Sequence, residues 1–193
     1  MKVKYDDIFI VQIKTTCREV NDSLSKKEVI ELGGCFLNVR SLASRDPFSL
    51  IVKPSTNLTE FCIRKTGITP EDVSSGVDFC DLLDFLREQS VDSMPWASYG
   101  SFAQHVLRSQ CGRDSESLPL SDRFLNIKSL FPIIYNLKHE LSLKSAMKEL
   151  DIPVPGEGMD SRDEALNVSI LLKELLRGPS ATKGNFVTCT KKR

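Results

Sequence analysis

The stretch Asp7–Thr15, DIFIVQIKT, decides the fold of this 193-residue chain. It opens on the continuous apolar run Ile8 to Val11 and continues as an alternation of polar and apolar residues. A run of this kind is typical of a strand that is buried on both faces. The sequence therefore predicts that Asp7–Thr15 is a central strand of a sheet.

Two more strands are predicted downstream of this one. Glu28–Val39 (EVIELGGCFLNV) is rich in apolar residues, and its Gly33-Gly34 pair indicates a bulge or a close packing contact. Pro47–Lys53 (PFSLIVK) is the third strand and is closed by Pro54. Because the connections are short, the three strands are expected to form an antiparallel meander.

Helical signals begin at Thr69, an expected N-cap that is followed by a proline and two acidic residues. A short strand is predicted at Pro95–Tyr99. Further helices are predicted at Phe79–Gln89, Phe102–Arg108, Asn126–Leu137, Ser142–Leu150 and Arg162–Arg177. This order indicates an α/β domain with a mixed sheet flanked by helices, covering residues 1–178. Residues 179–193 hold four basic residues and no acidic ones, and are predicted to be a flexible basic tail.

Composition excludes several classes of protein. Lysine and arginine balance aspartate and glutamate at 26 each, so nucleic-acid binding would need a local basic patch. No apolar run approaches the roughly 20 residues of a membrane span, and residues 1–7 lack the form of a signal peptide. None of the six cysteines forms a C-x-x-C pair, and most lie in apolar stretches. We therefore expect buried free thiols and an intracellular location, in cytoplasm or nucleus.

Several segments together resemble the DEDDh 3′–5′ exonucleases, which have the RNase H-like fold, and within them the Eri/Snipper-like branch that trims RNA 3′ ends. The resemblance runs from about Ile8 to Leu176. Its segments are Ile8–Val11 leading to Thr15-Thr16-Cys17, Val29–Gly33, Val52–Pro54, Thr66–Thr69, Ala97–Gly100, Asn126–Lys128 and Pro153–Ala165. The resemblance implies an RNase H-like sheet and, in active relatives, two divalent metals held by carboxylates.

The family's catalytic residues are largely replaced in this chain. The resemblance places the first-strand Asp and Glu on Gln12 and Lys14, and the middle Asp on Ala103. It places the general-base His on Met159 and the last Asp on Glu164. One acid of four survives, so we expect no bound metal cofactor. We also expect the Lys14 ammonium to pair with Glu164 inside the former metal site, the alternative being that Lys14 extends to solvent.

Neighbouring residues do not restore the site. Asp6 and Asp7 lie about 16 Å along the strand from Gln12, and Asp160 is expected to cap a helix. His105 and His139 are expected to be surface or half-buried residues. Neither stands in a nucleophile motif.

Some substrate-contacting features of the family persist. The candidate nucleic-acid-binding residues are Thr15, Thr16, Phe102 and Lys128, and the rings of Phe61 and Tyr99 are further candidates for stacking on a base. For each aromatic residue the alternative is a place in the core, and for Lys128 it is a solvated surface charge.

The sequence therefore predicts a catalytically degenerate exonuclease-fold protein. It would bind a single-stranded nucleic-acid 3′ end or a protein partner, with no membrane association. One alternative is a divergent, weakly active 3′–5′ exonuclease, and another is a purely structural subunit of a complex. The sequence does not indicate an oligomeric state.

Overall fold

The computed structural model describes residues 5–19, 23, 26–153 and 160–178. Five strands form one mixed sheet in the order β3-β2-β1-β4-β5. The strands β1, β2 and β3 are an antiparallel meander, whereas β4 runs parallel to β1 and β5 parallel to β4. The strand bounds are β1 Asp7–Thr15, β2 Val29–Asn38, β3 Ser44–Ile51, β4 Trp96–Ser98 and β5 Phe124–Asn126.

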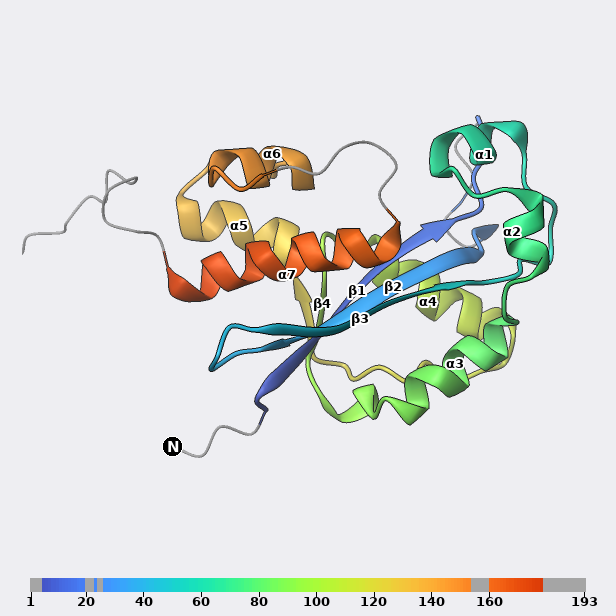
Figure 1. Cartoon of the computed structure of the whole chain (residues 1–193), viewed down its shortest axis with the longest axis horizontal. Coiled ribbons are helices and arrows are strands. Elements are labelled where there is room, and N and C mark those ends of the chain that lie inside the picture. Colours follow the sequence, from blue (N-terminus) through green and yellow to red (C-terminus); the bar gives the residue numbers. More distant parts are fainter. Residues whose placement is uncertain (1–4, 20–22, 24–25, 154–159, 179–193) are drawn as a thin grey trace, which may run out of the picture.

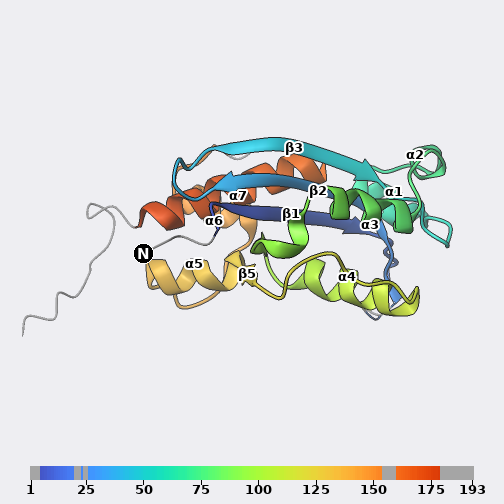
Figure 2. The ribbon, with the colours of Figure 1, turned by 90° about the horizontal axis from the view of Figure 1, so that it is seen from below.

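Helices cover both faces of this sheet (Figure 1). On one face lie α5 (Ile127–Tyr135), α6 (Leu143–Glu149) and α7 (Ser161–Arg177). On the other lie α3 (Phe79–Glu88) and α4 (Phe102–Arg113), with the short 3-10 helix η2 (Val91–Ser93). At the end of the sheet lie α1 (Glu60–Thr66) and α2 (Pro70–Ser74). Figure 2 shows this layered arrangement after a quarter turn.

Alternate side chains of β1 pack into different cores on the two faces of the sheet. Phe9 and Val11 belong to the apolar core under α3 and α4, whereas Ile8 and Ile10 belong to the core under α7. Because side chains alternate along a strand, Gln12 and Lys14 continue the face of Ile8 and Ile10. The α7 face of β1 therefore changes from apolar to polar toward the end of the strand.

Gly33 lets α7 approach the sheet at this polar end. It is the register partner of Gln12, and a methyl group built on it would lie 2.0 Å from the backbone carbon of Ser161. Such a separation is far below contact distance, so only glycine allows the first turn of α7 to rest on β2. The close packing contact predicted for Gly33-Gly34 is confirmed.

The predicted meander, mixed sheet and flanking helices are confirmed, and β1 has the predicted bounds. The N-cap at Thr69 is also confirmed, with a capping box to Asp72. The sequence reading missed α1 and β5. Helix α4 is longer than predicted, since it continues to Arg113. The predicted tail lies outside the described residues. Within the described part of the chain, no helix is both long and apolar enough to cross a membrane.

Candidate functional site

The candidate site lies where the polar end of β1 meets the first turn of α7. Asp160 caps this helix by accepting a hydrogen bond from the backbone N–H of Asp163 at 2.8 Å, as its predicted capping role requires. The cap and the close contact at Gly33 fix α7 against the strands. They bring Glu164, in the first turn of α7, to the face of the sheet that carries Gln12 and Lys14.

Lys14 lies at the centre of a buried charge network. Its ammonium nitrogen lies 3.0 Å from a carboxylate oxygen of Glu31, and both side chains are largely buried, at 14 % and 5 % exposed. Lys14 and Glu31 are register partners on β1 and β2, which explains their contact. The ammonium also donates a hydrogen bond to the backbone carbonyl of Thr66 at 3.3 Å, at the end of α1.

Glu31 has a complete set of partners. One carboxylate oxygen accepts a hydrogen bond from Ser49 at 2.9 Å. The other accepts from the hydroxyl of Ser161 at 2.9 Å and from its backbone N–H at 3.2 Å, in addition to Lys14. A buried carboxylate is tolerated only when it is paired and hydrogen-bonded in this way. Glu31 therefore joins β1, β3 and α7 through one side chain.

The predicted Lys14–Glu164 ion pair is wrong. Among the described residues the ion pair of Lys14 is with Glu31, and none within contact distance joins it to Glu164. Burial raises the pKa of the Glu164 carboxyl, while the nearby positive charge of Lys14 acts in the opposite direction. Lys14 thus does point into the site, as predicted, and its charge acts to lower the pKa of Glu164 without forming an ion pair with it.

Gln12 and Ala103 complete the described part of the site. The Gln12 amide oxygen accepts hydrogen bonds from the Ser98 hydroxyl at 2.7 Å and from the backbone N–H of Tyr99 at 3.2 Å, so it ties β1 to the end of β4. Ala103 is buried in the first turn of α4, with 3 % exposed. Met159 lies outside the described residues.

The residues predicted to contact nucleic acid differ in their burial and in their partners. Thr15 is buried, and the Thr16 hydroxyl accepts a hydrogen bond from the backbone N–H of Glu28 at 3.0 Å. Phe102, next to Ala103, is 40 % exposed. The ring of Phe61 lies under the Lys65 ammonium, 5.6 Å from its centre.

Lys128 reaches the same end of α4. Its Cδ would lie 3.8 Å from a methyl group built on Gly100, two residues before Phe102, and its ammonium pairs with Glu140 at 3.3 Å. By contrast, the Tyr99 ring packs against the apolar core under α7, and its hydroxyl donates to the backbone carbonyl of Leu141. His105 and His139 are both exposed, as expected.

Comparison with known proteins finds sequence relatives among the exoribonucleases. The chain is 26 % identical to the 3′-5′ exoribonuclease 1 of Rattus norvegicus in an alignment of 185 residues that covers 90 % of this chain and 54 % of the rat protein. It is 24 % identical to the 3′-5′ exoribonuclease 1 of Homo sapiens over 189 residues, again 90 % of this chain and 53 % of the relative. The chain thus spans about half the length of these relatives, and no protein-family model matches it.

The fold agrees with these relatives. The nuclease domain of 3′hExo, described as a DEDDh family member bound to rAMP, superposes with a TM-score of 0.81 at 24 % identity, covering 92 % of this chain and 94 % of that one. The chain is thus similar in sequence to Eri-like 3′–5′ exoribonucleases and has the fold of a DEDDh nuclease domain.

The DEDDh frame allows a test of whether this chain's residues fit the family's metals. Of the four positions that the resemblance assigns to the acids, Gln12 offers an amide oxygen that already accepts two hydrogen bonds, Lys14 a cation, Ala103 a methyl group and Glu164 a single carboxylate. The adjacent Glu31 carboxylate is taken up by Lys14 and two serines. Hard divalent cations require several free carboxylate or carbonyl oxygens. This donor set therefore does not fit a two-metal centre.

Sequence reasoning missed the role of Glu31. An available signal was its position as the lone acid within the apolar segment VIELGGCFL, because a buried carboxylate requires a partner of opposite charge or several hydrogen-bond donors.

Proposed function

We propose that the chain is a non-catalytic exonuclease-fold module that binds the 3′ end of a single-stranded nucleic acid without cleaving it. The observation that carries this proposal is the Lys14–Glu31 ion pair at the place where the DEDDh family holds its metals. Two-metal hydrolysis needs ions that activate a water and stabilise the leaving oxygen. An ammonium held by a buried carboxylate supplies neither function.

Binding without cleavage is supported by the groups around the former metal site. Phe102 presents an exposed ring at the start of α4, and on α1 the half-buried ring of Phe61 lies beside the Lys65 ammonium. Stacking on aromatic rings is the main sequence-independent way in which proteins hold single strands. Relatives of the same fold are described as recognising the 3′ end of a histone mRNA stem-loop and as binding rAMP.

Electrostatics defines what kind of binding to expect. The chain carries equal numbers of basic and acidic residues, and two cations of the site, Lys14 and Lys128, are each paired with a glutamate. Affinity from phosphate contacts falls steeply with salt. A complex held mainly by stacking on Phe102 and Phe61 is instead expected to depend only weakly on salt.

The direct test is binding of a labelled single-stranded RNA or DNA oligonucleotide, measured by fluorescence anisotropy in EDTA. We expect saturable binding that a linear competitor removes better than a circular one, because only the linear strand has a 3′ end. Phe102→Ala is expected to weaken binding roughly 10-fold, in line with the cost of losing one stacked base. Ile133→Ala is the matched control, since Ile133 is 76 % exposed on α5.

Absence of binding to every oligonucleotide, with the protein folded, would overturn the nucleic-acid proposal and favour a protein-scaffolding role. Equal loss of affinity in the Phe102 and Ile133 variants would show that the surface around Phe102 is not the binding surface.

A further inference from the structure

Two buried cysteines meet where the end of β1 packs against α1. Cys17 follows β1 and Cys62 lies in α1, and both belong to a small apolar cluster that also contains Ile30 and Val73. The sulfur of Cys62 lies 3.7 Å from the backbone carbonyl oxygen of Thr15, two residues before Cys17. The Cys62 thiol therefore points at the end of β1, two residues before Cys17.

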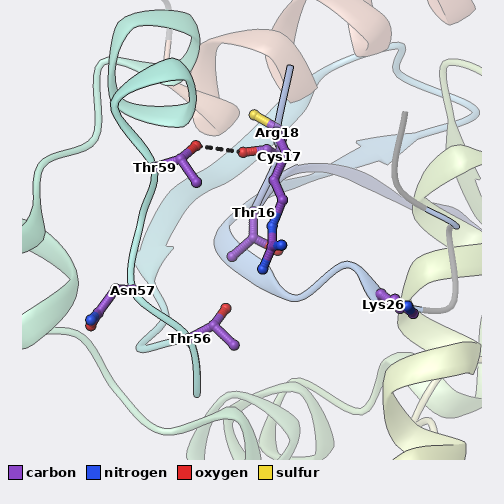
Figure 3. Close-up of a pocket in the computed structure, with 7 residues that line it drawn as sticks. All are labelled: Thr16, Cys17, Arg18, Lys26, Thr56, Asn57 and Thr59. Carbon is purple, nitrogen blue, oxygen red and sulfur yellow. Dashed lines mark hydrogen bonds between the residues drawn. The ribbon is translucent and has the colours of Figure 1, made fainter. Parts of the chain in front are cut away.

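Thr59 holds the two cysteine backbones together. Its hydroxyl donates to the carbonyl of Cys17 at 2.8 Å and accepts from the backbone N–H of Cys62 at 3.1 Å. Figure 3 shows the first of these hydrogen bonds. Both cysteines are free thiols, and they lie in the same buried cluster.

A cavity lies beside Cys17. It has a volume of about 240 Å³ and is lined by Cys17 together with Thr16, Arg18, Lys26, Thr56, Asn57 and Thr59 (Figure 3). Cys62, by contrast, is fully buried. Cys17 therefore lies beside a cavity that can admit hydrogen peroxide, whereas Cys62 is enclosed by protein.

We infer that Cys17 and Cys62 are an oxidation site that closes to an intramolecular disulfide in the presence of a peroxide. The Cys17 thiolate attacks one peroxide oxygen, the O–O bond breaks, and the departing hydroxide takes up a proton as water. The resulting sulfenic acid on Cys17 is attacked by the sulfur of Cys62, which loses its proton as the hydroxyl leaves as a second water. The peroxide is reduced to two waters, and the two thiols are oxidised to one disulfide.

The surroundings make this a slow reaction. Burial, together with the neighbouring Cys62, raises the pKa of Cys17 to about 11, although the charges of Lys65 and Lys27 act in the opposite direction. Because the thiolate is the nucleophile, Cys17 is mostly unreactive at neutral pH. Disulfide formation is therefore expected to be faster in mildly alkaline buffer.

The disulfide would constrain α1 beside the candidate site. It would tie β1 to α1, the helix that carries Phe61 and Lys65 and whose Thr66 carbonyl accepts the Lys14 ammonium. The inference depends on the two thiols alone and does not require the proposed nucleic-acid binding.

The test is peptide mapping of the full chain by mass spectrometry, without reductant, after treatment with hydrogen peroxide in mildly alkaline buffer. Cys80→Ser and Cys189→Ser are introduced first, because Cys80 is exposed and would form links between chains. We expect one peptide pair joined through Cys17 and Cys62, and two free thiols fewer per chain. Cys17 and Cys62 that stay unlinked, or a Cys17 oxidised further without capturing Cys62, would overturn the inference.

Two variants separate this pair from the other buried thiols. Cys62→Ala is expected to abolish the loss of two thiols, whereas a Cys35→Ala, Cys111→Ala variant is expected to retain it. If the Cys62 variant is unfolded, the linked peptide from the unaltered pair decides the question by itself.

Discussion

At the scale of single residues, the Lys14–Glu31 pair is the feature most sensitive to mutation. Lys14→Met would leave the Glu31 carboxylate buried beside only serine donors, and breaking a buried pair on one side costs about 3–5 kcal/mol. The loss should appear as a lower midpoint in urea unfolding, and Lys14→Met combined with Glu31→Gln should recover part of it. Arg40→Ala is the control: the Arg40–Asp6 pair is exposed, so it should cost less than about 1 kcal/mol. Equal costs for Lys14→Met and Arg40→Ala would refute the network.

Glu164 provides a second test at the residue scale, based on pH. Burial raises the pKa of its carboxyl in the folded state, so the native chain binds this proton more tightly than the unfolded chain does. Ionised Glu164 therefore lowers stability above the folded pKa, and this cost vanishes as the pH falls below the unfolded pKa. Glu164→Gln should raise the urea midpoint at neutral pH and leave it nearly unchanged in acid. A variant that is less stable at neutral pH would contradict this assignment.

At the scale of elements, the contact of α7 with β2 holds the site together. Gly33→Ala would place a methyl group 2.0 Å from the backbone of Ser161, so the helix start and its contacts with Glu31 must shift. Overpacking of this kind costs about 1–3 kcal/mol or more. Gly112→Ala in α4 is the matched control, because a methyl group there meets nothing within 4 Å, and it should be neutral or stabilising by up to about 1 kcal/mol. Thermal unfolding of both variants compares them, and an unaffected Gly33→Ala protein would show that α7 sits farther from the sheet.

At the scale of the whole molecule, the fold should accept a metal centre again if only its ligands have been lost. The variant combines Gln12→Asp, Lys14→Glu, Ala103→Asp and Glu164→Asp. It should be less stable than the parent chain without metal, because four acids then crowd one site beside Glu31. With Mn²⁺ at about 100 times the dissociation constant its melting temperature should rise by roughly 5–10 °C, whereas that of the parent chain should barely move. If the variant is folded but Mn²⁺ does not change its melting temperature, the backbone of the site has also changed.

Local sequence patterns predicted much of this architecture, but the partners within the site depend on tertiary contacts. The run in β1 and the Thr69-Pro70 cap are local signals, and both elements form where predicted. Helix α1 was missed although Thr59 caps its start and Gly67 its end, because Cys62 is the one residue of this helix that is buried and no apolar stripe marks it. The partner of Lys14 could not be obtained from spacing. It depends on the register that places Lys14 opposite Glu31, and on the arrival of Ser161 from the far end of the chain.

The central claim is that Lys14 and its neighbours have replaced a catalytic metal centre. The most direct test is a 3′-trimming assay on end-labelled single-stranded RNA and DNA with Mg²⁺ or Mn²⁺, with the Glu164→Ala variant run in parallel. The parent chain should leave both substrates at full length, with no difference between it and the variant. Metal-dependent shortening from the 3′ end that disappears in Glu164→Ala would contradict the account and identify an active exonuclease.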